Sequence, residues 1–200
     1  LDQKKLEIHL KKKLKIEKNA IVWVHLGTRG LGLIKNLNII TKAFENVLRV
    51  GVLIIPAFTY SWARKKNFKK DSEVDKNVGI YPNHLIKKKK FFRTNNPNFS
   101  VLILNKSKKN SNLFKNKIDS KTCFGKNSIF DILYNLSKNT PAYIILLGGA
   151  HDDVVFRTTF LHYVEELIGV EYRYIKKFYE PKNKVKFVNQ YVRYLSNKEY

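Results

Sequence analysis

His162 and Glu165 are the two residues of this 200-residue chain whose types and spacing are best suited to catalysis. They lie three positions apart in the segment Thr159–Glu166, so on a helix their side chains share a face. A carboxylate at that spacing can hold one imidazole nitrogen, which fixes the tautomer and raises the basicity of the other nitrogen. The pair therefore predicts a general base for an amine or a hydroxyl, although solvated helix surfaces carry the same spacing.

Two other segments offer polar groups at the end or the start of a strand. Pro56–Tyr60 follows a buried apolar run, and its alternative interpretation is a strand end closed by an aromatic plug. In Arg93–Ser100, the guanidinium of Arg93 can pair with a phosphate, while Thr94 and Ser100 supply hydroxyls. The alternative for this second segment is a turn closed by Asx-type hydrogen bonds around its proline.

A strand–helix–strand unit is predicted near the start of the chain. Ala20–Leu26 is rich in β-formers, a helix is expected over roughly 35–49, and Val52–Ile55 is the next buried strand. This order indicates an α/β sheet. A long, polar loop is expected over 60–77, because the segment is charged and aperiodic. Further expected elements are helices at 81–91, 128–137 and from 158 or 159 to 168, and strands at 99–104, 141–147, 170–175 and 185–192.

The predicted elements place the His162–Glu165 pair where α/β proteins carry their sites. The pair falls in the first turn of a helix that follows the strand Tyr143–Leu147 and a glycine-containing loop. Loops and helix N-termini at the ends of sheet strands commonly form active sites in this fold class. This position favours the catalytic interpretation of the pair.

One domain is expected over residues 1–200, because the sequence has neither an internal repeat nor a domain boundary. Residues 1–18 are predicted to form an amphipathic helix, with Leu6, Leu10 and Leu14 at steps of four. Residues 105–121 are rich in Lys, Asn and Ser, so a mobile loop is expected there.

The charge of the chain is strongly positive, with 39 Lys and Arg against 16 Asp and Glu, a net charge of +23. A pI near 10.0 makes a nucleic-acid-binding protein the alternative from another class. However, nearly all the charge is lysine, whereas phosphate and base recognition favours arginine. The hydrophobic fraction of 44% excludes a disordered basic tail. The basic excess therefore indicates a preference for anionic ligands more than a nucleic-acid partner.

Cysteine content and hydropathy indicate the cellular compartment, and the spacing of potential ligands indicates whether a metal is bound. A single cysteine, Cys123, fits a reducing compartment, and no apolar run has the length of a membrane span, so the cytoplasm is expected. Nothing near Cys123 in sequence would activate its thiol, so a buried structural thiol is preferred to a nucleophile. His151–Asp153 lacks the ligand spacing of a metal site, and no metal is expected.

Several segments, in order, resemble motifs of one enzyme family. Val24–Gly32 (VHLGTRGLG) is similar to V-H-S-S-L-S-S-L-G, and Gly51–Thr59 (GVLIIPAFT) is similar to G-T-L-V-M-P-T-F-T. Gly79 corresponds to a glycine before an E-x-F-R helix, and Arg93–Ser100 to R-S-x-H-P-x-x-S. These motifs are those of the aminoglycoside 3-N-acetyltransferase (antibiotic N-acetyltransferase) family.

The second half of the chain continues the resemblance, which extends from about residue 20 to 180. Phe124–Ile129 is similar to F-G-x-x-S-P, and Leu146–Gly149 to L-L-G-V. Thr159–Glu165 is similar to T-x-x-H-x-x-E, and Tyr172–Phe178 to Y-R-x-x-K-x-F. The resemblance, with the predicted elements, implies a three-layer α/β/α fold with a mixed central sheet.

The resemblance implies an acetyl-CoA-dependent transfer to an amino group on a sugar. His162 would be the base for the attacking amine, and Glu165 its orienting partner. The residues implied to bind the cofactor are His25, Leu26, Gly27, Thr59, Arg93, Thr94 and Ser100. The residues expected to bind the amino-sugar acceptor are Gly79, from the resemblance, and three local acidic groups of this chain, Asp75, Asp152 and Glu166.

The chain departs from the family pattern at four positions. Leu26 and Gly27 stand where the family has two serines, Ala57 replaces a threonine, and Asn96 replaces a histidine. These changes remove side-chain donors while leaving the backbone donors, so a non-catalytic relative that only binds CoA is a second alternative. Because a body of charge +23 repels polycations, an acceptor such as a nucleotide-linked amino sugar or a polysaccharide precursor is favoured over an aminoglycoside drug. A homo-oligomer is compatible with the sequence.

Overall fold

Five strands form the central sheet of the protein, shown in a computed structural model that describes residues 2–32, 34, 36–64, 67–106, 111–148, 160–180 and 183–194. The strands are β1 (Ile21–Leu26), β2 (Val52–Pro56), β3 (Phe92–Arg93), β4 (Val101–Asn105) and β5 (Ala142–Leu147). Their order is β3-β4-β2-β1-β5. β1 is parallel to β2 and β5, whereas β4 is antiparallel to β2 and β3, so the sheet is mixed as expected.

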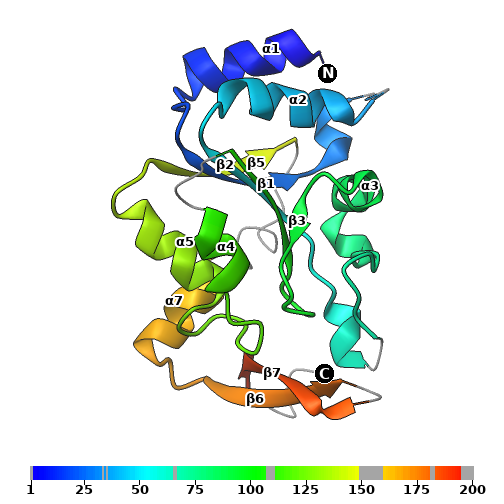
Figure 1. The fold of residues 1–200 in the computed structure, drawn as a ribbon, viewed down its shortest axis with the longest axis vertical. Helices are drawn as coiled ribbons and strands as arrows, with labels where there is room; N and C mark the ends of the chain where they lie inside the picture. The colour runs from blue at the N-terminus through cyan, green and yellow to red at the C-terminus, as the bar shows by residue number, and fades with distance from the viewer. Residues whose placement is uncertain are drawn as a thin grey trace.

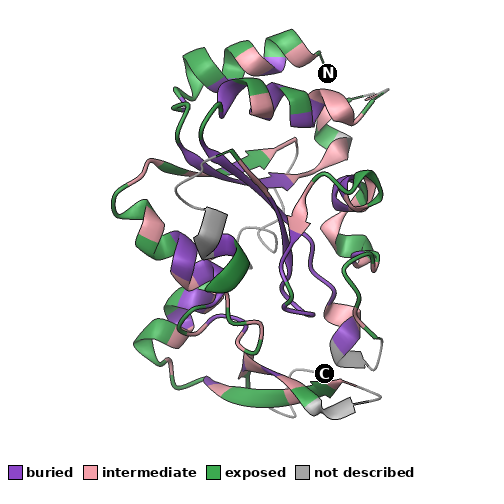
Figure 2. Ribbon diagram, viewed as in Figure 1, coloured by how far each residue is buried: buried purple, intermediate pink, exposed green. Residues whose placement is uncertain are grey.

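The two faces of the sheet have separate apolar cores, because successive side chains of a strand point to opposite faces. Val22 and Val24 of β1 belong to one core cluster, while Ile21 and Trp23 belong to the other. Helices cover both faces, with α1 and α2 on one side and α4, α5 and α7 on the other (Figure 1). Burial is concentrated along the central strands (Figure 2). The expected three-layer α/β/α architecture is confirmed.

The first helical layer contains α1 (Gln3–Ile8), a π-helical turn at His9–Lys13, and α2 (Asn38–Val47). α2 buries its apolar stripe against the sheet, with Ile40, Ala43, Phe44 and Val47 almost inaccessible. In the N-terminal segment, Leu6 and Leu10 are buried as predicted, but Leu14 is 42% exposed. The helix is shorter than the predicted 1–18, because it ends at Lys13 and the chain turns at Lys15, whose φ is 50°.

The opposite layer contains α4 (Ser111–Asn116), α5 (Ile129–Ser137) and α7 (Leu161–Ile168). Ser128 caps α5 by accepting a hydrogen bond from the backbone N–H of Asp131, as its sequence position predicts. α4 lies within the segment 105–121 that is predicted to be a mobile loop, and residues 107–110 of that segment lie outside the described residues. The mobility of the segment stays a prediction.

Short elements occupy the side of the sheet near β3. The segment 60–77, predicted as a loop, contains two 3₁₀ turns at Tyr60–Arg64 and Lys76–Val78, and α3 spans Ile80–Lys88. A further 3₁₀ turn, Thr28–Leu31, follows β1. β3 is not expected from the sequence, because two residues are too few to give a pattern.

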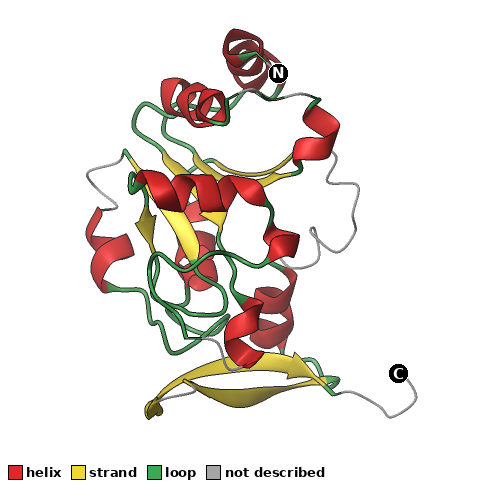
Figure 3. Cartoon of the chain, turned by 90° about the vertical axis from the view of Figure 1, so that its right-hand side faces the viewer, coloured by secondary structure: helices red, strands yellow, loops and turns green. Residues whose placement is uncertain are grey.

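A second sheet lies below the helices of the opposite layer (Figures 1 and 3). It is an antiparallel pair of β6 (Arg173–Glu180) and β7 (Asn183–Arg193), longer than the two late strands predicted from the sequence. Backbone hydrogen bonds tie Asn189 of β7 to Lys121 and Cys123. The hairpin is thereby attached to the loop that leads into α5. None of the helices in the described ranges is long and apolar enough to cross a membrane.

Candidate active site

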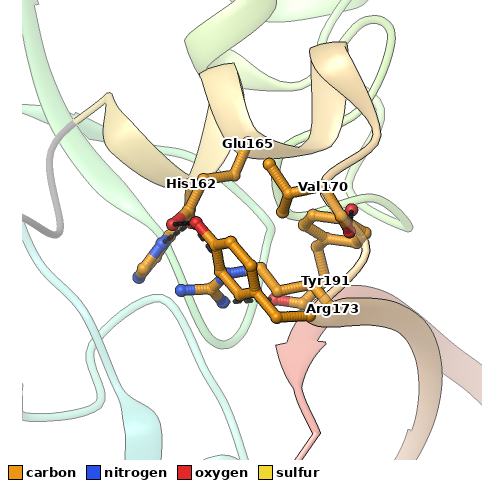
Figure 4. A network of polar contacts seen from close by, with 6 residues as sticks. His162, Glu165, Val170, Arg173 and Tyr191 are labelled. Atoms are coloured by element: carbon orange, nitrogen blue, oxygen red, sulfur yellow. Dashed lines mark hydrogen bonds and ion pairs between the residues drawn. The ribbon is translucent and has the colours of Figure 1, made fainter.

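The His162–Glu165 pair lies on α7, whose start is attached to the central sheet through Phe160. The ring of Phe160 packs edge-on against Trp23 of β1, with ring centroids 5.4 Å apart. One helical turn brings Nδ1 of His162 to 2.8 Å from Oε2 of Glu165 (Figure 4). The predicted contact between the two side chains is present. The threonines proposed to cap this helix, Thr158 or Thr159, lie outside the described residues.

The Glu165 carboxylate is buried, with only 4% of the residue exposed, and is surrounded by donors. Tyr172 donates its hydroxyl to Oε1 of Glu165 at 2.8 Å. Arg173 places Nε 2.8 Å from Oε2, in a buried ion pair. Arg173 also donates from Nη1 to the carbonyl of Tyr191, at 3.2 Å. The carboxylate thus joins α7 to the start of β6 and, through Arg173, to β7.

The electrostatics of the pair favour an ionised carboxylate and a neutral imidazole. Burial by itself would raise the pKa of Glu165, but hydrogen bonds from His162 and Tyr172 and the charge of Arg173 outweigh it and lower that pKa. Burial lowers the pKa of His162, aided by the charges of Arg173 and Arg193 and opposed by Glu165. An ionised Glu165 can only accept, so Nδ1 of His162 carries the hydrogen and Nε2 carries the lone pair. Nε2 is therefore the atom that can take up a proton.

A second group of predicted residues lies where β1 and β2 end. The parallel register pairs His25 with Leu146 of β5, and the N–H of Gly27 donates to the carbonyl of Leu147 at 2.8 Å. Trp23 donates from Nε1 to Nε2 of His25 at 2.9 Å. Burial lowers the pKa of His25 to about 4, so it stays neutral near pH 7. Leu26 and Gly27 are only half-buried.

The hydroxyls predicted to line the cofactor region are buried and hydrogen-bonded within the protein. Thr59 donates to the carbonyl of Pro97. Thr94 accepts from the N–H of Val101, and Ser100 donates to the carbonyl of Ala57. These contacts extend the pairing of β4 with β2 and β3 beyond the strand ends, so the side chains stabilise this end of the sheet.

Arg93, predicted as a phosphate partner, is 3% exposed and directs its guanidinium inward. Four of its N–H groups donate to oxygens of the chain: Ser100 Oγ and the carbonyls of Ala57, Lys70 and Ser72. Burial lowers the pKa of Arg93 to about 10, which leaves it charged at neutral pH. The contacts are those of a residue that ties the 67–75 loop to the strand ends.

Asn96, which replaces a histidine of the family pattern, organises the turn around Pro97. Its Oδ1 accepts from the N–H groups of Asn98 and Phe99, and its Nδ2 donates to the carbonyl of Thr122 at 2.9 Å. The alternative interpretation of this segment, an Asx-type turn, is confirmed by these contacts. The turn is buried and fastened to the loop before α5.

The residues predicted to bind the acceptor occupy different surroundings. Asp75 accepts from the N–H of Ser61 through Oδ2, and the backbone of Gly79 passes close to the carbonyl of Leu26. The described structure thus brings Asp75 and Gly79 to the end of β1 and β2. Glu166 follows Glu165 on α7, where burial raises its pKa. Asp152 lies outside the described residues.

Aromatic rings connect the two groups of residues. The His162 ring packs edge-on against Phe124, with centroids 5.3 Å apart. Phe124 is 4.6 Å from Phe99, which in turn contacts Phe58 and Tyr60 after β2. The aromatic plug considered for Pro56–Tyr60 is present, and it forms part of the packing between β2 and α7.

A family model described as aminoglycoside 3-N-acetyltransferase matches residues 23–199. The chain belongs to this family. Its members are acetyl-CoA-dependent N-acetyltransferases, and acetyl-CoA is their co-substrate, as the sequence motifs implied. A comparison with curated proteins gives no significant match.

Solved structures similar to this acetyltransferase share its fold at low sequence identity. YokD from Bacillus subtilis is 16% identical, with 96% of this chain and 82% of that chain covered and a TM-score of 0.72. AAC-IIIb, crystallised as a binary complex with CoASH, is 17% identical, with coverages of 96% and 76% and a TM-score of 0.73. A histidine-to-alanine mutant of AAC(3)-IVa in complex with a gentamicin is 17% identical, with coverages of 98% and 70% and a TM-score of 0.70.

Two other features of the acetyltransferase bear on its chemistry. Cys123 is 1% exposed, so its predicted burial is confirmed, and burial raises the pKa of its thiol well above the usual range. Among the described residues, no group of three or more His, Cys, Asp or Glu side chains could hold a metal ion.

Sequence reasoning assigned no role to Tyr172 and Arg173, although both lie in a family-like motif. The structure brings them to Glu165, seven and eight residues away along the chain. The available signal was Gly169, which ends α7 with a φ of 68° and lets the chain reverse. A tyrosine and an arginine directly after such a reversal return to the last turns of the helix.

Proposed function

We propose that this acetyltransferase moves an acetyl group from acetyl-CoA to an amino group of an amino sugar, with His162 as general base and Glu165 as its orienting partner. The observation that supports the proposal is the 2.8 Å contact between Nδ1 of His162 and the buried Glu165 carboxylate. This contact leaves Nε2 as the basic nitrogen. His162 is partly exposed at its side chain, 17%, so a substrate amine can approach it.

The chemistry needs a neutral amine, because an ammonium group has no lone pair. Nε2 of His162 takes a proton from the amine as its nitrogen attacks the thioester carbonyl. The carbon–sulfur bond then breaks, the thiolate of CoA leaves, and the amide forms. Glu165 stabilises the imidazolium that exists during this step, and Phe124 packs against the ring that must stay oriented.

The strand-end residues are proposed to form the CoA-binding side of the site. Leu26 and Gly27 are half-buried, so their surfaces can contact the cofactor, whereas Thr94 and Ser100 are under 2% exposed. We therefore assign direct contact to Leu26 and Gly27. The other five residues are assigned to stabilising the conformation of the strand ends: His25, Thr59, Arg93, Thr94 and Ser100.

The acceptor is proposed to be an amino sugar that carries phosphate, such as a nucleotide-linked one. The net charge of +23 favours anions, and Arg173 and Arg193 both act on His162 through their charge. Relatives crystallised with aminoglycosides, such as AAC-VIa bound to sisomicin, take a polycation instead. The proposal therefore gives this chain an anionic acceptor, whereas those relatives take a cationic one.

Release of the CoA thiol in the presence of an acceptor tests the activity. Acetyl-CoA is combined with a panel containing a nucleoside-diphosphate amino sugar, a free amino sugar, and sisomicin. We expect the fastest release with the phosphate-bearing acceptor and its loss in His162→Ala, while the exposed-histidine control His9→Ala keeps full activity. Full activity in His162→Ala would contradict the mechanism, and faster release with sisomicin would contradict the acceptor class.

A further inference from the structure

Tyr172 and Arg173 stand just after α7 and hold the carboxylate that orients the catalytic base. We infer that both are positioning residues of the acetyl transfer, which fix the Glu165 carboxylate in the orientation where it receives the Nδ1 hydrogen of His162. The inference rests on the proposed role of His162. Neither residue is proposed to touch a substrate.

The contacts fix both oxygens of the carboxylate. Oε1 of Glu165 accepts from the Tyr172 hydroxyl at 2.8 Å. Oε2 lies 2.8 Å from Nδ1 of His162 and 2.8 Å from Nε of Arg173. A carboxylate held at both oxygens cannot rotate about its χ3 torsion without losing a partner. The direction of the hydrogen bond to His162 is therefore set by Tyr172 and Arg173 together.

Arg173 is itself held by the hairpin of β6 and β7. Its Nη1 donates to the carbonyl of Tyr191, and the Tyr191 hydroxyl donates to the carbonyl of Val170 at 2.8 Å (Figure 4). The hairpin is attached to the loop before α5 through Asn189. The position of the Arg173 guanidinium beside Glu165 is thus fixed by its contacts with the hairpin, unlike that of a flexible surface side chain.

The charged groups around His162 come from three elements. α7 supplies Glu165, β6 supplies Arg173, and β7 supplies Arg193, whose guanidinium lies 5.8 Å from the Tyr172 ring. The loop before α5 contributes the apolar ring of Phe124. Because Tyr172 and Arg173 share the carboxylate's charge, their removal lets Glu165 act more strongly on the imidazole. The pKa of His162 should then rise.

The test measures that pKa directly by NMR titration of the imidazole of His162 in the full chain, with the signal assigned through His162→Ala. We compare Tyr172→Phe, Arg173→Gln and Arg173→Lys with wild type. Matched controls on the same strand are Tyr174→Phe, whose ring stacks on Tyr194, and the exposed Lys177→Gln. Thiol release with the best acceptor of the panel gives kcat and KM.

We expect Tyr172→Phe to raise the pKa of His162 and to lower kcat about 3- to 10-fold, with KM for acetyl-CoA unchanged. Arg173→Gln should raise the pKa further and lower kcat about 10- to 100-fold, and Arg173→Lys should recover part of both. The two controls should match wild type. Tyr172 is 51% exposed, so its variant should fold even if removal of the buried arginine does not.

An unchanged His162 pKa and a wild-type kcat in Tyr172→Phe would overturn the inference. A loss of activity with no change in that pKa would also overturn it, since it would indicate a merely structural role. Failure of the proposed function is a different result: His162→Ala would then keep its activity, whatever the Tyr172 and Arg173 variants do.

Discussion

The two polar regions of this acetyltransferase, at the strand ends and around α7, differ in whether their polar atoms all have hydrogen-bond partners within the protein. At the strand ends, the Arg93 guanidinium and the Ser100 hydroxyl are consumed by carbonyls and hydroxyls of the chain itself. Around α7, hydrogen bonds from His162 and Tyr172 and the ion pair with Arg173 converge on the Glu165 carboxylate, and the described residues provide no partner for Nε2 of His162. Polar side chains whose donors and acceptors all bind within the protein support the fold. A basic nitrogen at the end of a hydrogen-bond network that has no partner in the protein is available to bind a substrate proton.

Replacing His162 by alanine should have the largest effect on activity. Loss of a general base lowers kcat by about 10²- to 10⁴-fold, because the amine must then lose its proton to water. Thiol release measures the rate, and thermal unfolding should change little because the imidazole is partly exposed. His9→Ala is the matched control. A residual rate within tenfold of wild type would place the base elsewhere.

Replacing Arg93 by glutamine should affect stability rather than chemistry. The substitution removes the Arg93 donors to the carbonyls of Lys70 and Ser72 and one of the two donors to the buried Ala57 carbonyl, which we expect to lower the free energy of unfolding by about 2–4 kcal/mol. Urea denaturation measures this loss. The pH profile of the remaining active enzyme should match wild type. A rise in KM for CoA with unchanged stability would instead assign Arg93 to the cofactor.

The pH dependence of kcat/KM should distinguish the two histidines. The pKa of His162 in the folded protein lies below 6.5, so the neutral base persists through neutral pH and is lost as the pH falls through that lowered value. His25, with a pKa of about 4, titrates at lower pH. We therefore expect an acid limb below pH 6.5. The acceptor amine must also be neutral, so its own titration is measured separately. A limb above about pH 7 that does not follow the titration of the amine would be incompatible with a neutral His162 in the resting enzyme.

Replacing Ser100 by alanine should give the smallest effect of the series. The change removes one hydroxyl that donates to the Ala57 carbonyl and accepts from Arg93, so we expect a loss of about 1–2 kcal/mol in unfolding free energy. Thermal unfolding followed by circular dichroism is the measurement, and kcat should stay within twofold of wild type. A tenfold fall in kcat without destabilisation would make the strand-end region part of the chemistry.

The elements of the central sheet and of α2 could be predicted from the sequence because each has a local pattern of apolar residues. Apolar runs such as Val52–Ile55 and the stripe on α2 repeat with the period of the element that they form, and the parallel strands followed from their order. β3 and the 3₁₀ turns were not accessible, because they are too short to have a period. The end of the N-terminal helix at Lys13, with Leu14 exposed after it, is not revealed by the spacing of the leucines.

The sequence by itself determined that His162 and Glu165 share one face of a helix, because residues three positions apart lie on the same side of it. Only the tertiary structure decided which groups hold the carboxylate and which polar residues remain internal. Tyr172 and Arg173 reach Glu165 through the reversal at Gly169 and the support of β7, and Arg93 turns inward because four oxygens from separate segments meet there. Such contacts join residues distant in sequence, so no local period encodes them.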